Sequence, residues 1–219
     1  MFTNRRVIRT RRVALLLIGL AIGGGAVASE TELASIEGAA LVVIDVQAFY
    51  FPGGSVPLVD PEAASAHAGR LIECFRAAGR PVIHVQHLPK GVDTPDPTGI
   101  QAQYRIHADV LPKPGETLIG KHHANSFRET ELLATLRELG VKKLVIAGMQ
   151  THMCVEAAVR AAADYGFEVT VVGDACATRD LEFDGETVPA AQVHASTLAS
   201  LQGGYATVVS TAELCGATP

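Results

Sequence analysis

The stretch Leu144-Val-Ile-Ala-Gly-Met-Gln-Thr-His-Met-Cys154-Val155 decides the fold of this chain. It predicts a buried strand that stops at Gly148, then a sharp turn, then a helix with Cys154 at its start. The alanines that follow favour this helix and its close packing on a sheet. Because a helix N-terminus favours negative charge, we expect Cys154 to be a nucleophile with a depressed thiol pKa. The alternative is a buried, inert structural cysteine.

Two charged residues stand at the ends of other predicted strands. Residues 39–46 are strongly apolar except for Asp45 near their end, and the short pattern 117–120 is followed by Lys121. An unpaired buried charge is costly, so Asp45 is either a cap or a site residue, and Lys121 is either a solvated charge or a site residue. Ligands of open α/β sheets bind at the carboxyl ends of parallel strands. There Asp45 can act as a base toward the thiol, and Lys121 can hold both groups by charge.

Strand and helix patterns alternate along the chain. Strands are expected at 39–46, 81–87, 117–120, 143–147, 168–173 and 205–209, and helices at 61–79, 129–139, 153–166 and 187–201. This alternation predicts a three-layer α/β/α fold with a mostly parallel six-stranded sheet. The connection 88–116 contains five prolines. A loop of that length is usually functional, so we expect it to cover the active site or to meet a partner subunit.

The first 28 residues have the pattern of a signal peptide. They hold five arginines, an apolar segment and the small-residue site Ala26-Val27-Ala28. Arg11-Arg12 leaves both Sec and twin-arginine export open. The rival interpretation, an uncleaved anchor, requires about 20 apolar residues, more than this segment provides. We therefore expect a periplasmic or secreted protein with one mature domain, 29–219.

Composition narrows the class of partner. The formal net charge is -5 for 219 residues, and removal of the five N-terminal arginines lowers it to -10. An acidic mature domain argues against nucleic acid or a membrane surface as the main partner. The chain is 48% hydrophobic and contains no tryptophan, which favours tight α/β layers. We expect a small-molecule substrate and a homo-oligomer.

The motifs together resemble one family, the isochorismatase-like cysteine hydrolases. The resemblance covers nearly all of residues 38 to 212. The matching segments follow the family's order and spacing: Leu41-Val-Val-Ile-Asp45-Val-Gln47, Pro81-Val-Ile-His-Val-Gln-His87, Lys121 with Ser126-Phe127, Gly148-Met-Gln-Thr-His-Met-Cys154-Val155, and Val171-Val-Gly-Asp174-Ala175. The resemblance implies a catalytic triad of Asp45, Lys121 and Cys154. It also implies a cis peptide bond between Met149 and Gln150, and an oxyanion hole formed by the backbone amides of Gln150 and Cys154.

Further residues are candidates for the substrate pocket. They are Gln47, Phe49, Tyr50, Phe51, Phe127 and Thr151, and the alternative for each is a role in the core or in capping a turn. No metal or other cofactor is expected. His84 and His87 lie on opposite faces of one strand. The metal-dependent nicotinamidases carry an acid shortly after this strand, and the stretch Gln86-His87-Leu88-Pro89 lacks one.

Cysteine usage leaves a question open. The mechanism requires a free Cys154, although an oxidising compartment permits disulfides. Cys74 lies in an amphipathic helix pattern and is expected in the core, while the sequence does not show whether Cys176 and Cys215 meet. The function expected from these residues is an exported cysteine hydrolase that cleaves a C–N bond of an amide, carbamoyl or related small molecule through a thioester. The alternative is a redox-sensing or ligand-capturing thiol protein.

Overall fold

The structure is a computed structural model that describes residues 36–216. The signal peptide expected at residues 1–28 lies outside the described residues. No helix within the described range is long and apolar enough to cross a membrane.

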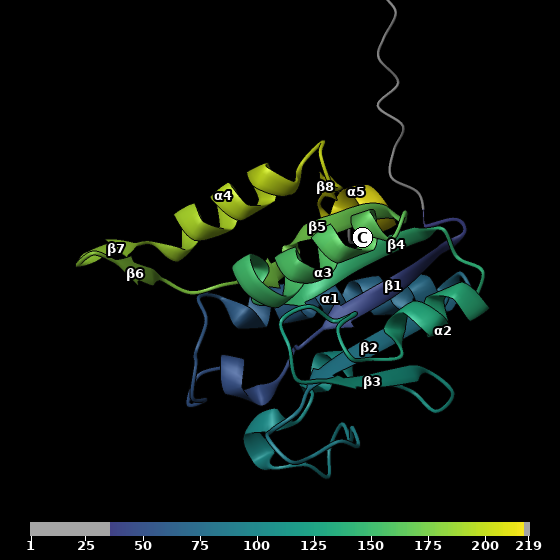
Figure 1. Ribbon diagram of the computed structural model, residues 1–219, viewed down its shortest axis with the longest axis horizontal. Helices are drawn as coiled ribbons and strands as arrows, with labels where there is room; N and C mark the ends of the chain where they lie inside the picture. The colour runs from purple at the N-terminus through teal and green to yellow at the C-terminus, as the bar shows by residue number, and fades with distance from the viewer. Residues whose placement is uncertain (1–35, 217–219) are drawn as a thin grey trace, which may run out of the picture. The chain divides into compact units, whose positions relative to one another are not determined.

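A six-stranded sheet forms the centre of the fold (Figure 1). Its strands are β1 (Ala39–Ile44), β2 (Val82–His87), β3 (Thr117–Lys121), β4 (Lys143–Met149), β5 (Glu168–Ala177) and β8 (Thr207–Val209). The spatial order is β3-β2-β1-β4-β5-β8, and every neighbouring pair is parallel. The strand order therefore reverses between β1 and β4, which is where open α/β sheets place a ligand crevice.

Helices cover both faces of the sheet, which confirms the predicted fold class. Helix α1 (Pro61–Ala77) packs Leu71, Ile72 and Phe75 against one face, and the short α5 (Thr211–Cys215) joins the same cluster. The other face is covered by α2 (Leu132–Glu138), α3 (Glu156–Asp164) and α4 (Ala190–Leu201). Strand β1 lies between the two clusters, and all six of its residues are buried.

Several local features differ from the expected pattern. The helix expected from residue 153 begins as a π-helical turn, Thr151–Val155, and α3 starts only at Glu156. A small antiparallel hairpin, β6 (Leu181–Phe183) and β7 (Glu186–Val188), precedes α4. Its turn is Asp184-Gly185 with both φ angles positive, and this dipeptide is a hairpin signal that the prediction missed. Short 3-10 turns lie at Ala48–Tyr50, Ala102–Tyr104 and Ala108–Val110.

The assignment of Cys74 to the core was wrong, because Cys74 is only half-buried, and it forms a disulfide with Cys215. The two residues are 141 positions apart in the sequence. They meet because α5 lies beside α1 on the same face of the sheet. Cys154 and Cys176 are both free and buried.

Candidate active site

Three side chains meet at the carboxyl edge of the sheet. Asp45 directly follows β1, Lys121 is the last residue of β3, and Cys154 lies in the π-helical turn after β4. The chain between β4 and this turn contains a cis peptide bond, Met149–Gln150, as the resemblance implies. Gly148 allows β4 to approach β1 closely, since its φ is +131° and a Cβ there would collide with the Ile44 backbone.

Lys121 connects the acid to the thiol. Its Nζ lies 2.6 Å from Asp45 Oδ2 and donates to Cys154 Sγ at 3.2 Å and to the His123 carbonyl at 3.0 Å. Two of the three ammonium donors make these hydrogen bonds, and the contact with Asp45 is an ion pair. The side chains of Asp45 and Lys121 are both fully buried. The lysine is therefore held in a fixed position between two groups that can each carry negative charge.

The electrostatics differ from the prediction of an activated thiolate. Burial raises the pKa of the Cys154 thiol to about 12, and Asp45 adds to this effect, whereas Lys121 acts in the opposite direction without overcoming it. Burial also lowers the pKa of Lys121, but the charges of Asp45 and Cys154 more than compensate and raise it above its usual value. The expectation of a depressed thiol pKa was wrong because desolvation and the adjacent carboxylate outweigh the lysine. The free site therefore holds a protonated thiol beside an ammonium.

A cavity of about 410 Å³ lies above the thiol. Aromatic and apolar side chains form most of its wall: Phe49, Tyr50, Val56, Tyr104, Ala124 and Met153. Polar side chains complete it: Ser55, His87, His122 and Gln150, with Cys154 itself. Tyr104 belongs to the long connection 88–116, so this loop reaches the cavity above the thiol. The sequence offered no signal for Tyr104 beyond the length of its loop.

Two of the expected pocket residues, Phe49 and Tyr50, line the cavity, and four do not. Gln47 is buried below the wall, where it donates to the carbonyls of His87 and Tyr104 at 3.0 and 2.6 Å and accepts from the His87 amide at 2.7 Å. Its amide therefore fixes the Tyr104 segment against the end of β2. Phe51 stacks on His107 instead, with ring centroids 4.0 Å apart.

The other two are occupied elsewhere in the fold. Phe127 packs in the core with Tyr165 and Phe167, because the chain after Lys121 turns back over α3. Thr151 is fully buried, and its hydroxyl shares a 3.0 Å hydrogen bond with His194 Nδ1 of α4. This bond connects the turn that carries Gln150 and Cys154 to a helix on the outer layer.

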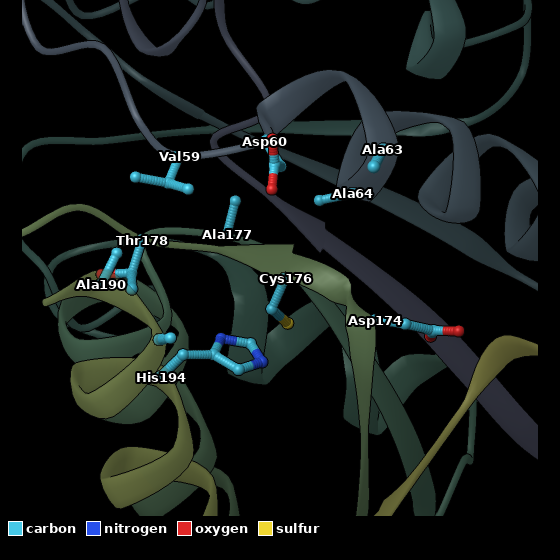
Figure 2. A pocket seen from close by; sticks show the side chains of 11 residues that line it. Val59, Asp60, Ala63, Ala64, Asp174, Cys176, Ala177, Thr178, Ala190 and His194 are labelled. Atoms are coloured by element: carbon cyan, nitrogen blue, oxygen red, sulfur yellow. The ribbon is translucent and has the colours of Figure 1, made fainter.

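A second cavity contains the other free cysteine (Figure 2). It measures about 240 Å³, and Cys176 and His194 both point into it. Burial raises the pKa of Cys176 to about 12, and its thiol donates to the Val172 carbonyl at 3.3 Å. No lysine contacts this thiol in the described part of the chain, in contrast to Cys154. The geometry therefore separates the two cysteines: Cys154 is hydrogen-bonded to Lys121, which lowers its pKa, whereas the charge of Asp174 raises the pKa of Cys176 further.

His84 and His87 of β2 have different surroundings, as their spacing along the strand predicts. His84 Nε2 lies 3.0 Å from Glu116 Oε2, whereas His87 lines the larger cavity. Between residues 36 and 216, no group of three or more His, Cys, Asp or Glu side chains is placed to hold a metal ion.

Comparisons with known proteins all point to the same family. The sequence model of the Isochorismatase domain matches residues 39–213. An uncharacterised isochorismatase family protein of Bacillus subtilis is 46% identical over 176 residues, which are 78% of this chain and 96% of that protein. A streptothricin hydrolase of Streptomyces noursei is 35% identical over 159 residues, covering 69% of this chain and 55% of that enzyme. The crystal structure of an isochorismatase from Pseudomonas putida superposes with a TM-score of 0.76 at 39% identity, covering 83% and 92% of the two chains.

Proposed function

The chain belongs to the isochorismatase family, and on that premise we propose that it is an exported cysteine hydrolase that cleaves a C–N bond of a small amide or carbamoyl compound. The family includes cysteine hydrolases and amidohydrolases that act on non-peptide C–N bonds. One observation carries the proposal. The Lys121 ammonium lies 2.6 Å from the Asp45 carboxylate and 3.2 Å from the Cys154 sulfur, and the larger cavity opens above that sulfur.

The reaction begins with transfer of the thiol proton. With its pKa raised to about 12, Cys154 does not ionise by itself at neutral pH, so Asp45 accepts the proton as sulfur attacks the carbonyl carbon. The buried Lys121 ammonium stabilises the negative charge as it moves from the carboxylate to the sulfur. The oxyanion of the tetrahedral intermediate accepts hydrogen bonds from the backbone amides of Gln150 and Cys154.

The proton held by Asp45 then leaves with the amine. The tetrahedral intermediate collapses, the C–N bond breaks, and the departing nitrogen takes the proton from Asp45. A water molecule attacks the resulting thioester while Asp45 accepts one of its protons. The second collapse releases the carboxylic acid and returns the proton to the Cys154 sulfur. The cycle uses one amide and one water, and it produces one acid and one amine.

A matched pair of cysteine variants tests the proposal. Release of ammonia from a panel of primary amides and carbamoyl compounds is measured for the wild type, Cys154→Ala and Cys176→Ala. We expect Cys154→Ala to lose more than about 10³-fold in turnover, because it removes the nucleophile. Cys176→Ala should retain turnover, because the hydrogen bonds of that thiol go to the backbone of Val172 and Gly148. Full activity of Cys154→Ala would end the cysteine-hydrolase proposal.

The thiol-sensor alternative receives no support from the site. Sensor cysteines are accessible and have low pKa values. Cys154 is 7% exposed, and burial raises the pKa of its thiol.

Export and assembly belong to the same proposal. Export rests on the signal-peptide pattern of residues 1–28, and the Cys74–Cys215 disulfide supports it because disulfides persist in oxidising compartments. A homo-oligomer is supported by the β6–β7 hairpin, which extends from one end of α4 (Figure 1) and carries Phe183 with 81% of its surface exposed. Sedimentation of the wild type beside Phe183→Ser tests the assembly, and a wild type that sediments as a monomer would contradict it.

A further inference from the structure

The wall of the cavity above Cys154 carries no lysine, arginine, aspartate or glutamate side chain among the described residues. Phe49, Tyr50 and Tyr104 form an aromatic cluster, with ring centroids 4.2 and 5.5 Å from Phe49. Aromatic faces favour flat or branched apolar groups. The shape and composition of the wall therefore suit an apolar acyl group.

Two opposite charges lie against the cavity floor, and the positive charge of Arg179 acts on Tyr50 from outside the wall. Asp45 and Lys121 lie below its floor, fully buried and paired with each other at 2.6 Å. Their opposite charges largely cancel for a ligand in the cavity above.

Burial also keeps two titratable side chains of the wall uncharged, His87 and Tyr50. Burial lowers the pKa of His87, so its ring is uncharged at neutral pH. Burial, with the nearby Asp45 and Cys154, raises the pKa of Tyr50, so its hydroxyl keeps its proton. His122 lies at the rim with a side chain that is 41% exposed, and its Nε2 is 3.6 Å from Asp93 Oδ1.

We propose that this cavity selects small primary amides whose acyl part is uncharged and apolar, and that it rejects amides bearing a carboxylate or an ammonium. The proposal rests on the hydrolase function proposed above, because it names the substrate class of that same site. The physical reason is desolvation. A charged substituent would lose its hydration in a cavity that offers no opposite charge to replace it.

Three probes of similar size test the selection. They are isobutyramide, the monoamide of succinic acid and glycinamide, each measured for ammonia release by the full-length wild type. We expect kcat/KM for isobutyramide to exceed that of both charged amides by about 100-fold. Equal or faster hydrolysis of either charged amide would overturn the selection while leaving hydrolysis by Cys154 intact.

Binding to the Cys154→Ala variant separates this inference from the proposed function. Ligand-detected NMR reports binding of the same three amides without turnover. If no amide is hydrolysed but isobutyramide alone binds, the proposed reaction fails and the selection is supported. If isobutyramide is neither bound nor hydrolysed up to its solubility limit, the selection is refuted.

A charge placed in the wall should reverse the preference. Ser55 lines the cavity and is exposed, so a longer side chain fits there without repacking the core. Ser55→Arg should raise the ratio of kcat/KM for the succinic monoamide over isobutyramide by at least about 10-fold, because the guanidinium can pair with the carboxylate. Ser55→Gln is the control, since it adds length without charge and should leave the ratio unchanged. A ratio that is equal in both variants would show that charge in the wall does not select the substrate.

Discussion

At Cys154, three effects decide where the thiol proton resides. Burial removes the water that would solvate a thiolate, Asp45 places negative charge beside the sulfur, and Lys121 alone favours ionisation. The first two prevail, so the free site stores the proton on sulfur, next to Asp45. This arrangement suits a reaction in which the proton moves only while the nucleophile attacks, and it protects the thiol from other electrophiles.

Replacement of Asp45 should uncouple thiol reactivity from hydrolysis. Asp45→Asn removes a charge that raises the thiol pKa and leaves Lys121 in place, so the pKa of Cys154 should fall. Alkylation by iodoacetamide at pH 7 should therefore be faster than in the wild type. Amide hydrolysis should fall by about 10²- to 10⁴-fold, because no acid remains to protonate the leaving amine. The measurement is the alkylation rate against pH, beside turnover.

Lys121→Met is the matched control for this prediction. It removes the group that lowers the thiol pKa, so alkylation should become slower than in the wild type at the same pH. Faster alkylation of Lys121→Met, or a wild-type thiol that titrates below pH 7, would refute the electrostatic account of the site.

At the scale of elements, one ion cluster holds the strand that carries Lys121. Glu116 directly precedes β3. Its carboxylate accepts hydrogen bonds from the Arg76 guanidinium of α1 at 2.7 and 2.8 Å and from the Lys113 amide at 2.8 Å, and it lies 3.0 Å from His84 Nε2 of β2. Its side chain is 15% exposed. Burial by itself would raise the pKa of Glu116, but these partners lower it to about 2. The cluster fastens the end of the long loop to α1 and β2, and so fixes the start of β3.

Glu116→Gln should destabilise the protein in a pH-dependent way. Because the pKa of Glu116 is lower in the folded chain than its usual value of 4.5, its contribution is complete above pH 4.5 and disappears as the pH falls toward 2. We expect a loss of about 2–3 kcal/mol in the free energy of unfolding at pH 7 and less than half of that at pH 3. Urea unfolding at both pH values measures it. Glu73→Gln, which removes an exposed partner of the same Arg76, should show no measurable loss, and a loss independent of pH would contradict the role of the Glu116 charge.

At the scale of the whole molecule, a covalent link joins distant parts of the chain. The Cys74–Cys215 disulfide closes a loop of 141 residues between α1 and α5. A cross-link over so long a loop restricts the unfolded chain much more than the folded one. The described domain therefore draws part of its stability from an oxidising environment, in agreement with the proposed export.

Removal of this link should lower the thermal stability. Cys215→Ser should cost about 2–5 kcal/mol, seen as a lower Tm than that of the oxidised wild type. Dithiothreitol should bring the wild type to the same Tm and should not change the variant. A wild type that does not respond to reductant under unfolding conditions would show that the disulfide adds no stability.

The mature chain from the native host should begin at Ser29. Cleavage is expected after Ala28, because Ala26-Val27-Ala28 follows the apolar segment as a small-residue site. N-terminal sequencing of the exported protein measures it directly. Recovery of an intact Met1 from the mature material would contradict the signal-peptide interpretation.

Much of the architecture and the three central residues were predictable from local patterns. Apolar strands alternating with helices predicted the parallel sheet. Asp45 directly follows a strand, Lys121 closes one and Cys154 lies in the turn after another, which made them candidates, and the family resemblance joined them as a triad. The cavity wall was less predictable. Phe49 is next to the acid in sequence and does line it, but Phe127 follows Lys121 just as closely and lies in the core. Proximity in sequence does not decide which side of a turn a ring will face.

The sequence by itself determined the fold class, the strand order along the chain and the chemical identity of the three side chains that meet at the carboxyl edge of the sheet, because periodicity, glycine positions and residue type are local properties. Only the tertiary structure decided the Cys74–Cys215 pairing, the contribution of Tyr104 to the cavity and the protonation of Cys154. Each of these depends on groups that are distant in sequence. A disulfide requires two elements to lie side by side, a cavity requires loops to converge, and a pKa responds to burial and to charges that arrive from other strands.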